Sequence, residues 1–164
     1  MIAALLAAAV LAQTAAPPTP VAEGRRTIGI FAGWGAFADP APRRCYAIAK
    51  PISRRTALYP FASVANWPGA RVRNQLHLRL SRRRAPSAQV TLSIGERRFP
   101  LRAGQLDAWA PDAAADRAIV AAMRSGRSMS VESVAEGGRP FVDVYPLEGA
   151  ATAIDAAALA CLPR

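Results

Sequence analysis

Chemistry that needs an imidazole has a single candidate in this chain, because His77 is the only histidine. His77 alternates with Leu76 and Leu78, which places it on the polar face of an expected strand. A general base needs a positioned partner, and the sequence indicates none. A Gly-x-Ser-x-Gly elbow, a phosphate-binding loop and a Gly-x-Gly-x-x-Gly fingerprint are absent from the sequence. We expect His77 to be a solvated surface residue and the protein not to be an enzyme.

Clustered metal ligands and paired carboxylates are also scarce. Two distant cysteines and one histidine cannot supply a zinc site, so no metal and no cofactor is expected. Asp112 and Asp116 stand four residues apart on one face of an expected helix, where capping or a solvated role is predicted. Asp143 lies between Val142 and Val144 on an expected strand, and the pattern allows a buried, paired carboxylate or one facing solvent near an arginine.

Arginine clusters are the remaining candidates for a binding role. The chain has 21 basic and 11 acidic residues, a net charge of +10, and Lys50 is its only lysine. The clusters at the two ends of one expected hairpin suggest a basic rim for an anionic ligand, since guanidinium groups suit phosphate and carboxylate. They consist of Arg82, Arg83 and Arg84 at one end and Arg97 and Arg98 at the other. The alternative is dispersed, solvated arginines at turns; no aromatic-rich motif predicts a specific nucleic-acid partner.

The two cysteines have two possible states that depend on the compartment. Cys45 and Cys161 are far apart in the sequence and are its only cysteines. In an oxidising compartment such a pair forms one disulfide, whereas in the cytosol both would be buried free thiols.

The first residues indicate export. Residues 1–12 form an apolar run that is too short to span a bilayer, which takes about 20 residues, and that fits a secretory signal. Three prolines follow within residues 17–20 and read as an extended linker. We predict a signal peptide at 1–16, a Pro-rich linker at 17–26 and one domain at 27–164. The absence of a cysteine at the cleavage region argues against a lipoprotein, so we expect a periplasmic or secreted protein with one disulfide and no transmembrane segment after cleavage.

The rest of the chain reads mainly as strands. Period-two alternation is clearest at 73–82, recurs at 89–94 and 98–102, and the Gly95-Glu96 pair predicts a hairpin turn between the latter two. Pro100 predicts an edge position. Residues 28–39 read as one bent strand, and residues 52–69 read as irregular apart from a turn at 66–69. Further extended segments are expected at 45–49, 106–109, 128–135 and 139–147.

Two helices complete the expected fold. The first spans 112–125, capped by Asp112 and ended by Gly126, and the second spans about 150–160 after Gly149. Cys161 shares a face with Ile154, which would turn it toward the strand of Cys45. We therefore expect a mainly β fold, a β-sandwich or open barrel of about seven short antiparallel strands with two helices.

Several short motifs resemble one known family. A Gly33-Trp34 pair precedes the segment Arg-Cys-Tyr-Ala-Ile at 44–48, and the last third contains Ser125-Gly126, Gly137-Gly138 and a Pro-Leu-x-Gly step at 146–149 before an alanine-rich helix. In these features the chain resembles the invasion-associated locus B family of alphaproteobacterial envelope proteins over most of 28–162.

The resemblance implies an exported, non-enzymatic β-sandwich without a known cofactor, and it transfers no catalytic residue. On this interpretation the protein is a cell-envelope accessory protein that acts by binding an envelope or host partner of unknown identity. The alternative is a cationic binder of anionic envelope polymers or lipids such as lipopolysaccharide. A small periplasmic hydrolase that uses His77 is the least favoured hypothesis.

Overall fold

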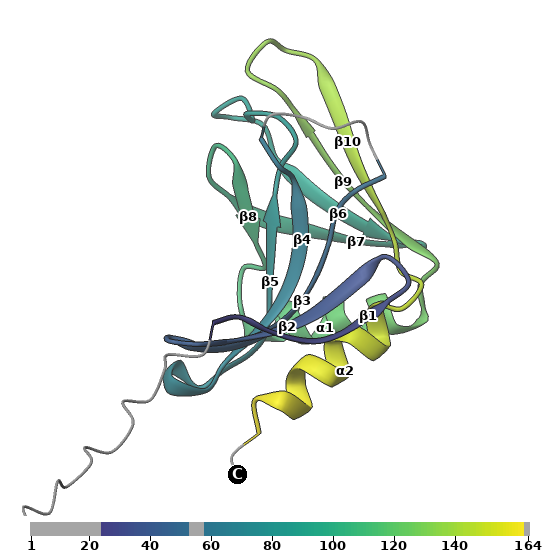
Figure 1. The fold of residues 1–164 in the computed structure, drawn as a ribbon. Coiled ribbons are helices and arrows are strands. Elements are labelled where there is room, and N and C mark those ends of the chain that lie inside the picture. Colours follow the sequence, from purple (N-terminus) through teal and green to yellow (C-terminus); the bar gives the residue numbers. More distant parts are fainter. Residues whose placement is uncertain (1–23, 53–57, 163–164) are drawn as a thin grey trace, which may run out of the picture.

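Ten strands and two α-helices make up the part of the chain that the structure, a computed structural model, describes: residues 24–52 and 58–162 (Figure 1). The predicted signal peptide and most of the linker lie outside these residues. The strands are β1 (Arg26–Phe31), β2 (Trp34–Pro40), β3 (Arg43–Ala49), β4 (Phe61–Trp67), β5 (Val72–Arg79), β6 (Val90–Ile94), β7 (Arg97–Ala103), β8 (Asp107–Trp109), β9 (Ser128–Val134) and β10 (Pro140–Pro146). The helices are α1 (Ala113–Ser125), α2 (Ala150–Ala160) and the short 3-10 turn η1 (Pro68–Ala70).

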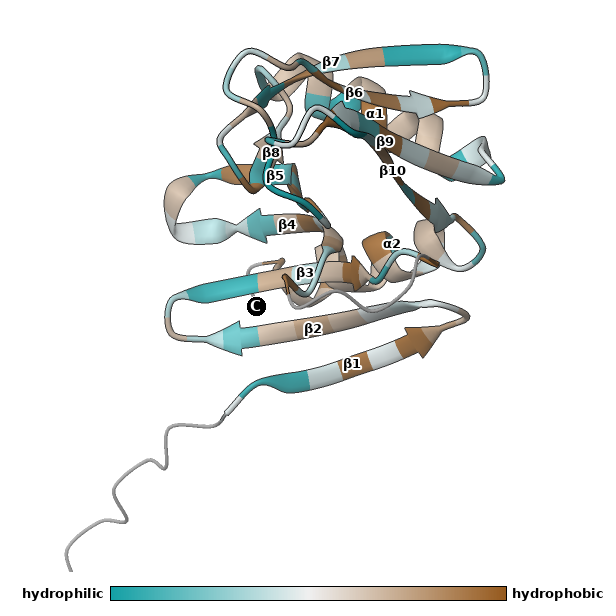
Figure 2. Cartoon of the chain, turned by 90° about the horizontal axis from the view of Figure 1, so that it is seen from above, coloured by the Kyte–Doolittle hydropathy of each residue, from teal (hydrophilic) through white to brown (hydrophobic). Residues whose placement is uncertain are grey.

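All ten strands belong to one antiparallel sheet, in the order β1-β2-β3-β4-β5-β8-β7-β6-β9-β10. Seen from above, the sheet curves into an incomplete ring, and α2 lies near the opening between β3 and β10 (Figure 2). Ile52 bridges this region by donating its N–H to the carbonyl oxygen of Val144 at 2.9 Å. The mainly β class with two helices is confirmed, and of the two expected architectures the curved sheet corresponds to an open barrel.

The expected number of about seven strands is wrong, for two local reasons. Residues 28–39 do not form one bent strand, because the chain turns at Ala32 and Gly33 and returns as β2. β4 lies within the segment predicted to be irregular. Alanine and serine in Phe61–Trp67 give it weak strand propensity, but it pairs on both sides, with β3 and with β5.

The predicted alternation accounts for the core. Leu76 and Leu78 are fully buried, while their neighbours Gln75, His77 and Arg79 lie on the opposite face of β5. β6 repeats the pattern, and its hairpin to β7 turns at Gly95, which has a φ of 56°. Pro100 pairs with Thr91 of β6, and β8 reaches only Arg102 and Ala103 of β7, so Pro100 lies where its second side has no partner strand among the described residues.

The helices begin and end close to the predicted residues. Asp112 Oδ1 accepts the N–H of Ala115 at 2.8 Å, and Gly126 follows the last residue of α1. Arg124 near the end of α1 holds both carboxylate oxygens of Asp155 on α2, at 2.9 and 2.6 Å, so one bidentate ion pair ties the two helices together. Among the described helices, none has the length and apolar character needed to cross a membrane.

Candidate functional site

The strands β1 to β4 have one face packed on α2 and one face turned away from it. On β3, Cys45, Ala47 and Ala49 are buried in the core that α2 shares, so Tyr46 and Ile48 point to the other side. The strand register places Gly35 of β2 and Ser63 of β4 beside Ile48 on that outer face. No described helix covers this outer face.

An apolar groove of about 500 Å³ runs over this outer face. Its walls combine aliphatic and aromatic side chains, two of which are unusually exposed for their type: Ile30 at 64% and Tyr59 at 80%. Lys50 is the only charged residue that lines it. The complete lining is Ile30, Ala32, Gly33, Gly35, Phe37, Ile48, Ala49, Lys50, Tyr59, Pro60 and Phe61. Below, "the apolar groove" means this set of residues.

Gly35 shapes the floor of the apolar groove. A Cβ on Gly35 would lie 2.6 Å from the ring of Phe37 and 3.1 Å from Cδ1 of Ile30. Because glycine has no side chain, the phenyl ring of Phe37 and the Cδ1 atom of Ile30 pack directly against the backbone of β2 at Gly35. The floor of the apolar groove is therefore apolar and lies close to the strand backbone, which leaves the space above it open to a ligand.

Tyr59 stands at the rim of the apolar groove on strained backbone. Its φ is 49°, a left-handed conformation that a bulky L-residue rarely adopts, and its side chain remains 80% exposed. The preceding residue is anchored, because Arg79 Nε donates to the carbonyl oxygen of Leu58 at 2.9 Å. Burial of Tyr59 in the fold does not offset this strain, so a role for the aromatic ring at the rim is the natural interpretation.

His77 belongs to a cluster that supports the apolar groove, and the expectation of a simply solvated residue is wrong. Its Nε2 lies 2.8 Å from Asp107 Oδ1, and its ring stacks on Trp109 with centroids 5.1 Å apart. Phe61, which lines the apolar groove, meets the same imidazole edge-on at 5.1 Å. These partners come from β4 and β8, neighbours of β5 in space, and residue spacing along the sequence could not reveal them.

The cluster lacks the arrangement that nucleophilic catalysis requires. Ser63 is the cross-strand partner of His77, but its Oγ bonds the backbone carbonyl oxygen of His77 at 3.5 Å rather than the imidazole. An activated serine needs its hydroxyl within reach of the base nitrogen. In the described residues, no group of three or more His, Cys, Asp or Glu side chains could hold a metal ion.

The two remaining candidate carboxylates are structural. Asp116 is 8% exposed and accepts the backbone N–H of Leu76 at 2.8 Å. The prediction of a capping or solvated role is therefore wrong for Asp116, whereas Asp112 caps α1 as predicted. Burial raises the pKa of Asp116. Asp143 is 1% exposed and accepts the N–H of Ser81 at 2.9 Å, which decides the open alternative in favour of burial. Burial likewise raises the pKa of Asp143.

The five arginines of the expected basic rim do not converge. The Arg84 guanidinium donates hydrogen bonds to backbone carbonyl oxygens, among them those of Ala88 at 2.5 Å and Gly104 at 2.9 Å. It thereby connects the segment before β6 to the segment after β7. Arg83 donates to Gln105 at 2.8 Å, next to the end of β7, whereas Arg97 and Arg98 begin that strand. Arg82, which precedes Arg83 in the sequence, is exposed. The two clusters therefore lie at opposite ends of β7, about 20 Å apart for a strand of this length.

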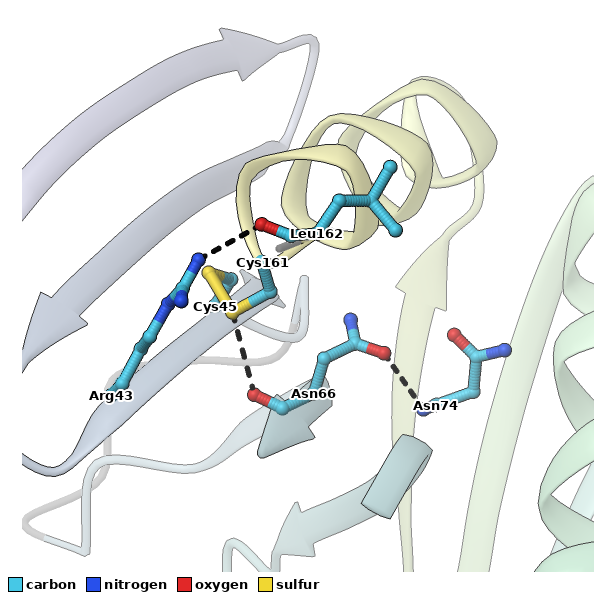
Figure 3. The surroundings of a disulfide bond; sticks show 6 residues. All are labelled: Arg43, Cys45, Asn66, Asn74, Cys161 and Leu162. Atoms are coloured by element: carbon cyan, nitrogen blue, oxygen red, sulfur yellow. Dashed lines mark hydrogen bonds between the residues drawn. A yellow bond between two sulfur atoms is a disulfide. The ribbon is translucent and has the colours of Figure 1, made fainter. Parts of the chain in front are cut away.

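The disulfide between Cys45 and Cys161 joins β3 to the end of α2, with Cα atoms 5.7 Å apart, as predicted (Figure 3). Cys45 lies opposite Asn66 of β4, and Arg43 donates to the carbonyl oxygen of Leu162 at 3.0 Å. The tail of α2 is therefore held to the sheet by one covalent bond and one hydrogen bond close to it.

Two of the motifs behind the family resemblance, Gly33-Trp34 and the step at 146–149, meet in space. Trp34 is fully buried and donates its indole N–H to the carbonyl oxygen of Pro146 at 2.9 Å, across 112 residues of sequence. Gly149 has a φ of 81°, and a Cβ there would overlap the backbone carbonyl group of Phe31. These residues thus connect the β1–β2 turn to the start of α2, so both motifs have a structural role.

Comparison with known proteins supports the fold. No family model matches the sequence, and no curated protein matches it. Among solved structures, the chain is similar to the crystal structure of invasion associated protein B from Bartonella henselae. The match has a TM-score of 0.58 at 15% sequence identity and covers 82% of this chain and 98% of that one. The chain therefore has the fold of invasion associated protein B.

Proposed function

We propose that this protein is an exported cell-envelope protein that binds an anionic amphiphile, with the acyl chain held in the apolar groove. The observation that carries the proposal is the groove itself, an apolar site with an exposed aromatic rim on the sheet face left uncovered by the helices. Exposed apolar surface of this kind marks a site of interaction in a folded protein. The fold of invasion associated protein B and the disulfide support the proposed export.

The size and lining of the apolar groove suit an acyl chain. About 500 Å³ falls in the range of ordinary ligand sites, which are mostly apolar with few polar groups. Ile30, Ile48 and Phe61 offer aliphatic and aromatic contact without a hydrogen-bond donor that a polar ligand would need. Each methylene group that leaves water for such a surface contributes about 0.8 kcal/mol.

The charge at the apolar groove favours an anionic head group. Lys50 is exposed at the end of β3, and no acidic residue lines the groove. A flexible ammonium group at the edge of an apolar site can pair with the phosphate or carboxylate of a ligand while the acyl chain of that ligand lies in the groove. A neutral amphiphile would gain the apolar contacts but not this pairing.

Binding without catalysis remains our proposal. Ser63, His77 and Asp107 lie on neighbouring strands, yet Ser63 bonds a backbone oxygen and His77 directs its Nε2 to Asp107. We interpret this cluster as the support that holds Phe61 and, through Arg79, the residue before Tyr59.

Calorimetric titration of the mature domain with decanoate and shorter fatty acids tests the proposal. Affinity is expected to rise up to about fourfold for each added methylene, the equivalent of about 0.8 kcal/mol. Lys50→Gln is expected to weaken binding of decanoate and to leave binding of the neutral 1-decanol unchanged.

A matched pair of variants separates the apolar groove from general surface hydrophobicity. Ile30→Asp places a charge in the groove on β1, whereas Val142→Asp changes another exposed β-branched residue, on β10 at the other edge of the sheet. Ile30→Asp is expected to lower decanoate affinity at least about tenfold, and Val142→Asp to leave it unchanged. Equal effects of the two variants, or an affinity that does not depend on chain length, would contradict the proposal.

A further inference from the structure

A second cleft, of about 470 Å³, lies beside the disulfide and is separate from the apolar groove. It is formed by the β4–β5 hairpin on one side and the end of α2 on the other. Three arginines and two asparagines line it, and no acidic residue does. The lining is Arg43, Asn66, Pro68, Arg71, Val72, Arg73, Asn74, Ala158, Leu159, Cys161 and Leu162.

Asn66 brings a buried donor without an acceptor to this cleft. Its side-chain Oδ1 accepts the backbone N–H of Asn74 at 3.1 Å, which fixes the orientation of the amide because a backbone N–H can only donate. Nδ2 is therefore the other terminal atom, and it has no acceptor among the described residues although Asn66 is 6% exposed. Figure 3 shows Oδ1 turned to Asn74 and Nδ2 turned toward the last turn of α2.

An unpaired donor in a nearly buried amide calls for an acceptor. Leaving such a group unsatisfied costs about 1–3 kcal/mol, so native structures provide a partner for almost all of them. Nδ2 itself is shielded from solvent, so a ligand oxygen in the adjoining cleft would reach it through a small local shift of the Asn66 side chain. The Asn66 amide therefore points to a ligand that carries hydrogen-bond acceptors.

The arginines of the cleft indicate the charge of that ligand. Arg71 and Arg73 are exposed, and within residues 24–52 and 58–162 neither side chain has a hydrogen-bond or ion-pair partner. One guanidinium nitrogen of Arg43 donates to the carbonyl oxygen of Leu162, and this hydrogen bond holds the Arg43 side chain beside the cleft. Three guanidinium groups around one neutral amide form a strongly positive environment that favours an oxyanion.

We infer that this cleft is an anion site, in which Asn66 Nδ2 and the guanidinium groups of Arg43, Arg71 and Arg73 bind a phosphate or carboxylate group. The apolar side chains of Val72 and Leu159 in the same cleft fit an organic body attached to the anion. The site shares no residue with the apolar groove or with the five arginines of the expected basic rim. It is therefore a separate candidate for binding an anion.

Titration of the oxidised protein with inorganic phosphate, followed by two-dimensional amide NMR, tests the inference. The Asn66 side-chain NH2 resonances are expected to shift saturably. Asn66→Asp keeps the oxygen that accepts from Asn74 but replaces the orphan donor with a negative oxygen, and it is expected to weaken phosphate binding at least about tenfold. Melting temperatures of each variant confirm that the fold is retained.

A charge-matched pair of double variants excludes a general effect of net charge. Arg71→Gln/Arg73→Gln removes two positive charges at the cleft, and Arg97→Gln/Arg98→Gln removes two at the β6–β7 turn. Only Arg71→Gln/Arg73→Gln is expected to abolish the phosphate-induced shift of the Asn66 side-chain resonances. Equal losses in both, an unchanged affinity in Asn66→Asp, or a resonance that phosphate and phosphatidylglycerol vesicles both leave unmoved would overturn the inference.

The vesicles also identify the source of the anion. Saturation by inorganic phosphate alone assigns a free oxyanion. Binding only to vesicles of phosphatidylglycerol, with none to phosphatidylcholine and none in Arg71→Gln/Arg73→Gln, assigns a lipid head group.

Discussion

At the scale of single residues, buried polar groups divide into those that the fold satisfies and those that it leaves available. Asp116 meets the N–H of Leu76, and Trp34 meets the carbonyl oxygen of Pro146. Asn66 Nδ2 and Asp143 Oδ1 are left without partners among the described residues. Asn66 borders an open cleft, so its free donor can serve a ligand, whereas Asp143 is enclosed and only lowers stability when it ionises.

Asp143 makes stability depend on pH in a defined direction. Burial raises its pKa, against the opposing influence of the Ser81 N–H and Arg82. The folded state therefore holds this proton more tightly than the unfolded chain, and its contribution to stability falls as pH rises from the ordinary aspartate pKa through the raised one. Asp143→Asn cannot titrate, so the melting temperature of the variant relative to wild type should increase between about pH 4 and about pH 8.

Asp155→Asn provides a control of opposite sign. The hydrogen bonds from Arg124 lower the pKa of Asp155, so its contribution is present above the ordinary aspartate pKa and is lost on acidification. The melting temperature of Asp155→Asn relative to wild type should therefore decrease as pH rises to about 5 and stay level from there to about pH 8. The decrease is expected to be slight because the pair is largely exposed. Parallel pH profiles for the two variants would show that burial does not govern Asp143.

At the scale of elements, the junction between the β1–β2 hairpin and α2 depends on close backbone approach. Gly149→Ala is expected to cost at least about 2 kcal/mol in free energy of unfolding. The added Cβ would overlap the Phe31 carbonyl group, and alanine disfavours the φ of 81° at this position. Chemical denaturation monitored by circular dichroism measures the change.

Gly137→Ala is the matched control for this junction. A Cβ on Gly137 meets open space in the turn between β9 and β10, and its φ lies outside the left-handed region. Its unfolding free energy is expected to stay within about 0.5 kcal/mol of wild type. If both alanine variants were equally stable, the contact between Gly149 and Phe31 would not restrain α2.

At the scale of the whole molecule, one covalent link closes most of the domain into a loop. Cys45 and Cys161 are 116 residues apart, and a loop of this length restricts the unfolded chain by about 4–5 kcal/mol on the chain-entropy account. Reduction is therefore expected to lower the melting temperature markedly. A Cys45→Ala/Cys161→Ala variant should melt at the lower temperature and show no further response to reductant. An identical melting temperature with and without reductant would contradict a stabilising role for the disulfide.

Features that arise from local patterns could be predicted from the sequence alone. Alternation at Leu76 and Leu78, the Asp112 cap and the Gly95 turn each involve a few neighbouring residues, and all three are present as predicted. The disulfide was predicted from the two cysteines and the expected export. β4 was missed because its alanines and serine carry little local preference, and its two neighbouring strands stabilise it instead.

The residues that come together in the two proposed binding sites could be found only from the three-dimensional fold. The apolar groove combines residues of β1, β2, β3 and β4, and the anion cleft combines a hairpin with the end of α2. The arginine runs that dominate the sequence lie at opposite ends of β7, while the partners of His77 come from strands about 15 and 30 residues away. An antiparallel sheet places distant segments side by side. Its curvature and register depend on all strands together, and they determine which side chains converge.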